Sequence, residues 1–203
     1  MKIICIGRNY LAHVKELDND LPAEPLFFMK PETALLSQGE PFVYPDFSQQ
    51  IHYETELVLH ICKTAKNIEE AEAKDCFDAI TVGIDFTARD LQSHCKAKGH
   101  PWEIAKAFDG SASMGKFKKI NELKCCDDIG FGMKLNGKWA QQGYSRDMIF
   151  GFGKLLAHVS RFVTLQPGDC LFTGTPQGVG EVHRGDRLEL FLEGEPIFNF
   201  EVK

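Results

Sequence analysis

Glu54 and Glu56, separated only by Thr55, are the first residues whose spacing suggests chemistry in this chain. They lie in the segment His-Tyr-Glu-Thr-Glu-Leu-Val-Leu-His at residues 52–60. Because side chains alternate between the two faces of a strand, both carboxylates would lie on one face, about 7 Å apart. Carboxylate oxygens are the ligands that hard divalent cations prefer. A short triplet of this kind also fits a half-buried strand with a solvated outer face, so the pair alone leaves both interpretations open.

The aspartate that follows the apolar run 79–84 is a candidate third ligand. That run predicts a buried strand. Asp85 beside Glu54 and Glu56 would give three carboxylates with positions left for water and substrate, the pattern expected of a Mg²⁺ or Mn²⁺ site. The alternatives are that Asp85 caps a helix or pairs with a cation. Asp90 is a competing ligand, although it falls inside the helix predicted next.

His13 and Glu16 are spaced i, i+3 on a short predicted helix, residues 10–17, and would share one face of it. A carboxylate beside an imidazole orients the ring and raises its basicity, which suits a general base. The alternative is an ordinary surface pair. The polar stretch that follows, residues 18–25, predicts a mobile loop.

Two further stretches hold polar groups in unusual surroundings. Lys106 lies among Trp, Ile, Ala and Phe in residues 101–110, where a lysine either extends its ammonium to solvent or is held to bind an anion. The glycine-rich turn 172–180 lacks the Gly-Lys-Ser/Thr of a phosphate-binding loop and the context of a dinucleotide site. Its backbone N–H groups would cradle a carboxylate, or the turn merely reverses the chain.

A frame of short strands and few helices must position these residues. Apolar runs and alternation predict strands at residues 2–6, 26–29, 41–44, 51–62, 79–84, 171–173, 187–192 and 196–202. Helical spacing predicts helices at residues 10–17, 68–77, 87–98 and 146–162, the third ending at Gly99. Asn136-Gly137 between residues 129–135 and 138–142 is the strongest hairpin signal. The mixture predicts an α+β fold.

Composition excludes several classes of protein. The chain has 203 residues, enough for one sizeable core, and its 23 basic and 29 acidic residues give a net charge of −6 without a basic block. A nucleic-acid or anionic-membrane surface is therefore not expected. Apolar runs are too short for a signal peptide or a membrane span, so we expect a soluble, cytoplasmic protein. Seven scattered cysteines without a Cys-x-x-Cys pair indicate reduced thiols.

Taken together and in order, the motifs resemble those of the fumarylacetoacetate hydrolase family, in its short single-domain branch of acylpyruvate hydrolases and oxaloacetate decarboxylases or tautomerases. The matching segments are Gly7-Arg8-Asn9-Tyr10 with His13 and Glu16, Phe28-Met29-Lys30-Pro31, His52-Tyr53-Glu54-Thr55-Glu56, Asp85-Phe86-Thr87-Ala88-Arg89-Asp90, Pro101-Trp102 with Lys106, and Thr173-Gly174-Thr175-Pro176 with Gly178-Val179-Gly180. Each segment alone is a weak signal, but the ordered set is specific.

The resemblance implies a role for each candidate residue. Glu54, Glu56 and Asp85 would hold Mg²⁺ or Mn²⁺. His13 and Glu16 would form a catalytic dyad on a lid segment, residues 10–25. The remaining candidates would serve catalysis or substrate binding: Lys106 as a catalytic residue, and Arg8, Gln92 and Thr175 as substrate-binding residues. Lys30 belongs to a matching motif.

The resemblance also implies the fold and the activity. The family fold is a mixed β-sheet roll flanked by helices, here one catalytic domain over residues 1–203, usually in a homodimer. The implied enzyme acts on a small 2-oxo or 2,4-dioxo carboxylic acid through a pyruvate-like enolate, and hydrolysis of a carbon–carbon bond in an acylpyruvate is the main prediction. The alternatives are oxaloacetate decarboxylation or tautomerisation, isomerisation of a 2-hydroxy-dienedioate, and an idle ligand-binding protein of the same fold.

Overall fold

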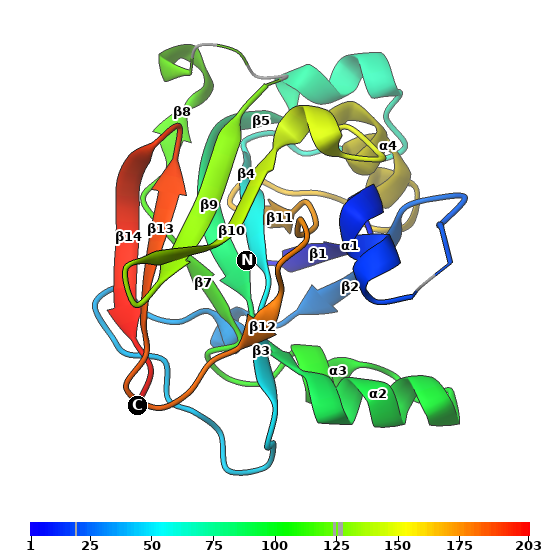
Figure 1. Ribbon diagram of the computed structural model, residues 1–203. Coiled ribbons are helices and arrows are strands. Elements are labelled where there is room, and N and C mark those ends of the chain that lie inside the picture. The colour runs from blue at the N-terminus through cyan, green and yellow to red at the C-terminus, as the bar shows by residue number, and fades with distance from the viewer. Residues whose placement is uncertain (19, 124, 126–127) are drawn as a thin grey trace.

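The computed structural model describes residues 1–18, 20–123, 125 and 128–203. The largest of the three sheets that these residues form is mixed and lies at the centre of the molecule (Figure 1). Its strand order is β2–β1–β11–β4–β5–β7, with β8 also beside β5. β1 and β11 run parallel, and the other pairs are antiparallel. The strands are β1 (Ile3–Gly7), β2 (Leu26–Lys30), β4 (Thr55–Ile61), β5 (Phe77–Asp85), β7 (Ala112–Met114), β8 (Lys118–Lys119) and β11 (Cys170–Phe172).

A second, four-stranded antiparallel sheet has the order β10–β9–β13–β14. Its strands are β9 (Gly130–Leu135), β10 (Lys138–Tyr144), β13 (Arg187–Leu192) and β14 (Glu195–Glu201). The predicted hairpin is confirmed: Asn136 and Gly137 join β9 to β10 with φ angles of 52° and 78°, the left-handed values that a tight two-residue turn requires. A small third sheet contains β12 (Gly180–Glu181), β3 (Ile51–Tyr53) and β6 (Thr87–Ala88).

Alternation along the strands builds two hydrophobic layers. In β1, Ile4 and Ile6 face the main core, which also contains Leu57 of β4 and Leu190 of β13 and so lies between the two larger sheets. The other face of the central sheet packs into a smaller cluster of Ile3, Cys5, Val58, Ala112, Met114, Cys170 and Phe172. The central strands are therefore covered on both faces, and polar side chains on them are withdrawn from water.

Helices flank this roll, as expected of an α+β fold (Figure 1). They are α1 (Leu11–Glu16), α2 (Arg89–Lys98), α3 (Glu103–Lys106) and α4 (Phe152–Phe162), with 3₁₀ turns at Glu32–Ala34, Glu70–Asp75, Ile120–Glu122 and Ser145–Asp147. α2 and α3 pack together at one end of the central sheet. Gly99 ends α2 with a φ of 68°, as predicted. None of the helices formed by the described residues is long and apolar enough to cross a membrane.

Three element predictions are wrong or too long. Residues 68–77 contain a short 3₁₀ turn rather than an α-helix. Residues 41–44 make only one isolated bridge, from Phe42 to Val202. Pro41 within the segment and Pro45 directly after it have no N–H to donate to a strand ladder. The helix predicted from Arg146 begins at Phe152.

The late start of α4 has a local cause. The Asn9 side chain donates to the Phe150 carbonyl at 3.0 Å and accepts from the Phe150 N–H at 2.8 Å, and Ile149 N–H donates to the Asn9 carbonyl at 2.8 Å. The backbone groups of Ile149 and Phe150 are therefore bonded to Asn9, two residues after β1, rather than to a helix. Gly151 then provides the N-cap of α4.

Candidate active site

The predicted strand 51–62 is divided at Glu54 into β3 and β4. The break changes the surroundings of both glutamates, because β3 pairs with β6 and β12 whereas β4 lies in the central sheet. Glu54 is only 6% exposed and Glu56 only 1%. The solvated-face interpretation is therefore wrong, and two buried carboxylates require partners.

Asp85 provides a third carboxylate at the same place. It ends β5, whose Ile84 is paired with Thr55 of β4, so the strand register brings it beside the two glutamates. One carboxylate oxygen from each of Glu54, Glu56 and Asp85 lies within 4.8 Å of the others. Asp90 does not join them.

The Asp90 carboxylate instead anchors the loop before β3. It accepts hydrogen bonds from the Ser48 hydroxyl at 2.6 Å and the Gln49 N–H at 2.9 Å, and it also accepts one from the Leu91 N–H at 2.8 Å. α2 begins at Arg89 rather than at Thr87 and has no side-chain cap.

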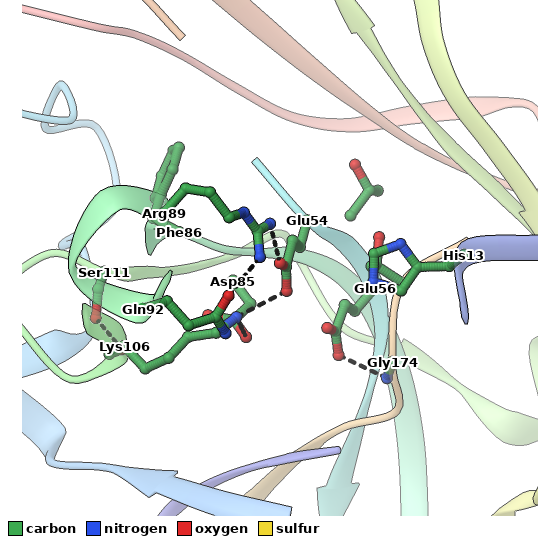
Figure 2. Close-up of polar contacts among 12 residues, drawn as sticks. His13, Glu54, Glu56, Asp85, Phe86, Arg89, Gln92, Lys106, Ser111 and Gly174 are labelled. Atoms are coloured by element: carbon green, nitrogen blue, oxygen red, sulfur yellow. Dashed lines mark hydrogen bonds and ion pairs between the residues drawn. The ribbon is translucent and has the colours of Figure 1, made fainter. Parts of the chain in front are cut away.

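Two cationic side chains contact Glu54 in the acidic cluster (Figure 2). Lys106 Nζ lies 2.7 Å from Glu54 Oε2 and 2.8 Å from Asp85 Oδ2. Arg89 Nη2 lies 2.5 Å from Glu54 Oε1. Lys106 is only 2% exposed, so its ammonium does not extend to solvent and is held against anions.

The pKa values of these groups follow from burial and charge. Burial alone would raise the pKa of Glu54, but Lys106 and Arg89 outweigh it and hold that pKa well below its ordinary value. Burial alone would lower the pKa of Lys106, but Asp85 and Glu54 raise it above its ordinary value. The pKa of Glu56 is raised by burial and by the neighbouring Asp85 and Glu54 carboxylates. Negative charge is thus least compensated at Glu56, where a cation would be most favourable.

His13 and Glu16 form a contact on α1. His13 Nδ1 lies 3.3 Å from Glu16 Oε2, and the Gly178 N–H donates to Glu16 Oε1 at 2.9 Å. His13 is 5% exposed, so this is not an ordinary surface pair. Burial lowers the pKa of His13 below the usual histidine value, against the raising effect of the Glu54 and Glu16 carboxylates. A neutral imidazole oriented by a carboxylate can accept a proton near neutral pH.

The turn after β11 contributes to the same region. Gly174 N–H donates to Glu56 Oε2 at 2.7 Å, so the turn does cradle a carboxylate, that of a protein side chain. Gly174 has a φ of 99°, and a Cβ there would lie 2.6 Å from Asn9 Cβ. Only glycine fits this position.

One pocket collects most of the predicted residues, namely Arg8, His13, Glu54, Glu56, Gln92, Lys106 and Thr175. Glu16 and Asp85 do not line it but contact it through His13 and Lys106. In Figure 2, Arg89, Gln92 and Lys106 lie to one side of Glu54 and His13 lies to the other. Phe28 and Trp102 supply apolar wall. The pocket thus sets a candidate base opposite cationic groups, with carboxylates between them.

Sequence reasoning assigned no contact to two cations of the site. Arg89 belongs to the matching segment 85–90, but its contacts depend on how α2 packs. It pairs with Glu54 and donates to Gln92 Oε1 at 2.6 Å. Lys30 is fully buried and lies 2.8 Å from Asp85 Oδ1. A lysine ending an apolar strand was the available signal, because an unpaired ammonium cannot remain in a core.

The donor set of the cluster fits a hard divalent cation. Glu54, Glu56 and Asp85 offer carboxylate oxygens alone, which suit Mg²⁺ or Mn²⁺ rather than a soft metal. Asp85 Oδ1 has its ion pair to Lys30 but no aligned hydrogen bond, and it is buried. A buried oxygen of this kind retains ligating capacity.

The chain is similar to known proteins along nearly its whole length. The model of the fumarylacetoacetate (FAA) hydrolase C-terminal family matches residues 2–203. Mitochondrial oxaloacetate tautomerase of Bos taurus is 36% identical over 99% of this chain and 91% of its own length.

Two solved structures are similar along the whole chain. Fumarylpyruvate hydrolase from Pseudomonas aeruginosa, in complex with Mn²⁺ and pyruvate, is 35% identical, with a TM-score of 0.93 over 100% of this chain and 89% of that one. A family protein from Yersinia pestis is 39% identical, with a TM-score of 0.95 over 100% and 93% of the two chains. The predicted mixed roll is therefore confirmed, and the chain belongs to the fumarylacetoacetate hydrolase family.

Proposed function

We propose that this protein is a divalent-metal-dependent enzyme that hydrolyses a carbon–carbon bond of an acylpyruvate. Family members include hydrolases and tautomerases, so an enzymatic role is supported at that level. The observation that favours hydrolysis is the His13–Glu16 pair, because a hydrolase needs a base for water and His13 lines the pocket of the acidic cluster.

Glu54, Glu56 and Asp85 would hold Mg²⁺ or Mn²⁺. When bound, such a cation supplies Lewis-acid stabilisation for negative charge on the oxygens of a 2-oxo acid. The Mn²⁺ of the Pseudomonas aeruginosa enzyme supports this choice.

The chain's own groups would perform the proton transfers. His13, oriented by Glu16, accepts a proton from a water that attacks the distal carbonyl of the substrate. The bond between that carbonyl carbon and the methylene then breaks, giving a carboxylic acid and the enolate of pyruvate. The proton on His13 is returned to the enolate carbon. Lys106 keeps its ammonium near the developing charge, and Arg8, Gln92 and Thr175 would bind the substrate's polar groups.

The runner-up is decarboxylation or tautomerisation of oxaloacetate, which the tautomerase relatives favour. Both reactions pass through the same kind of enolate and need no attacking water. Isomerisation of a 2-hydroxy-dienedioate is a related alternative. An idle binding protein would show no turnover of any of these substrates.

A substrate panel with matched variants tests the proposal. Acetylpyruvate, oxaloacetate and a 2-hydroxy-dienedioate are assayed with Mn²⁺, using the wild-type protein, His13→Ala and, as control, a His94→Ala variant at an exposed position of α2. We expect acetylpyruvate cleavage that only His13→Ala loses, by about 10²–10⁴-fold, the usual contribution of a general base. Turnover by isomerisation alone, or cleavage unaffected by His13→Ala, would reject the hydrolase assignment.

Two further expectations belong to this proposal. We propose a homodimer by analogy with the family, which light scattering tests, and a cytoplasmic location, which fractionation tests. We also propose that residues 10–25 act as a lid over the pocket, because His13 and Leu17 already line it.

A further inference from the structure

Gln141 is a buried amide in the second sheet whose side chain reaches into the central sheet. It lies in β10 directly after an irregularity in the β9–β10 register, and it is 1% exposed. Its Oε1 accepts the Thr55 N–H at 2.8 Å, and its Nε2 donates to Thr175 Oγ1 and to the Pro176 carbonyl, each at 2.9 Å. Both donors of the amide and one acceptor site are therefore used.

The Thr55 N–H belongs to the peptide that joins Glu54 to the strand carrying Glu56. It lies at the break between β3 and β4, where regular pairing is interrupted. Rotation of this peptide would change the direction of both carboxylates, because their Cα atoms lie on either side of Thr55. The Asp85 N–H donates to the Glu54 carbonyl at 2.8 Å, and the Thr55 N–H donates to Gln141 Oε1. Both polar groups of this peptide are therefore hydrogen-bonded.

The other bonds of Gln141 fix the turn that carries Thr175. The same turn presents Gly174 N–H to Glu56 at 2.7 Å and Gly178 N–H to Glu16 at 2.9 Å. It is also packed on β10: a Cβ on Gly178 would lie 2.6 Å from the Ala140 carbonyl oxygen. One amide therefore links the acidic cluster, a pocket-lining hydroxyl and the turn that contacts the partner of His13.

We propose that Gln141 is a positioning residue for the metal and substrate site, an inference that rests on the proposed function. Gln141 does not line the pocket and so acts through Thr55 and Thr175. Partners that orient metal ligands from outside the coordination sphere commonly affect metal affinity or activity by about 10–100-fold when removed. The alternative is a purely structural role, in which Gln141 only supplies hydrogen bonds to buried backbone groups. Its loss would then lower the stability of the protein without changing Mn²⁺ affinity.

Binding of Mn²⁺ separates the two roles. Gln141→Met keeps the length of the side chain and removes all three bonds; Gln142→Met, at the exposed neighbouring position on the opposite face of β10, is the matched control. Titration calorimetry with Mn²⁺ alone is run below the melting temperature of each protein. We expect Gln141→Met to bind Mn²⁺ about 10–100-fold more weakly than the control. At saturating Mn²⁺ we also expect a raised KM, because Thr175 loses its anchor.

The outcomes are distinguishable. Equal Mn²⁺ affinity in folded Gln141→Met and Gln142→Met, with only a lower melting temperature in the first, would overturn the positioning role. If Gln141→Met did not fold, Gln141→Asn would replace it, because its side chain is one methylene shorter and withdraws the same amide. Its Mn²⁺ affinity would be compared with that of Gln142→Met in the same way. A wild-type protein that bound no Mn²⁺ would overturn the proposed function and this inference together, whereas normal binding with no turnover of the substrate panel would overturn the function alone.

Discussion

The Lys106 ammonium lies 2.7 Å from Glu54 Oε2, whereas the hydrogen bond to Glu56 Oε2 comes from a neutral donor, the Gly174 N–H. Two glutamates of one predicted metal site are thus stabilised differently before any cation binds. Glu54 has two cationic partners, Lys106 and Arg89. Glu56 adds a negative charge that its backbone donor only partly offsets.

This asymmetry predicts different stabilities for two matched variants. Glu54→Gln should cost the metal-free protein about 3–5 kcal/mol, because Arg89 loses its carboxylate partner and Lys106 loses one of its two. Glu56→Gln keeps an acceptor for Gly174 N–H and removes a repelling charge, so the metal-free protein should unfold at the wild-type temperature or above. Both variants should lose Mn²⁺ binding. Thermal unfolding in EDTA and Mn²⁺ titration measure these effects. Equal destabilisation by the two substitutions, or retained affinity in both, would contradict the prediction.

Substitution of Lys30, which does not line the pocket, should lower the stability of the protein strongly. Its buried ammonium pairs with Asp85 and also donates to the carbonyl and hydroxyl of Ser111, each at 3.0 Å, and to the Lys106 carbonyl. Lys30→Met should destabilise the protein by about 3–5 kcal/mol, because buried Asp85 loses one of its two lysine partners and the Ser111 carbonyl loses a buried donor. Urea unfolding measures the loss, with the exposed Lys138→Met as control. A change as small as that of the control would show that the ammonium is dispensable.

Asp90 predicts a pH-dependent contribution to stability. Burial alone would raise its pKa, but hydrogen bonds from Ser48 and the Gln49 and Leu91 N–H groups hold that pKa below the ordinary value. A carboxyl with a lower pKa in the folded state stabilises the protein fully above its unfolded pKa, about 3.9, and this contribution is lost as the pH falls through the folded value. Because the carboxylate is partly exposed and screened by water, Asp90→Asn should cost only about 0.5–1.5 kcal/mol at pH 7 and progressively less below about pH 4.

Chemical denaturation across this pH range, with the exposed Asp109→Asn as control, measures the Asp90 effect. Mn²⁺ affinity should not change, because Asp90 is bonded to the loop before β3 rather than to the acidic cluster. A pH-independent difference between Asp90→Asn and wild type would exclude the carboxylate charge as the cause.

Local patterns predicted the convergence of the acidic residues but not their surroundings. Strand alternation placed Glu54 and Glu56 together, and the apolar run ending at Asp85 indicated a neighbouring strand; the register of β4 and β5 confirmed their proximity. The break at Glu54 was not predicted, because no glycine, proline or other turn residue marks it in the sequence. Gln141 was missed because its partner Thr55 lies 86 residues away in another sheet. Contacts of this length depend on packing between sheets, which no local spacing encodes.

If residues 10–25 close over a bound ligand, that ligand should protect them from proteolysis. Lys15 is exposed on α1, next to Glu16, which accepts the Gly178 N–H. Cleavage after Lys15 requires local opening of this helix. A ligand that must leave before the helix opens, present at 100 times its Kd, would slow such cleavage about 100-fold. With Mn²⁺ and oxalate, a mimic of the pyruvate enolate, trypsin should therefore cut more slowly after Lys15 and at an unchanged rate after Arg184, which is exposed outside the predicted lid. Equal rates after Lys15 with and without oxalate would show that residues 10–25 do not close over the ligand.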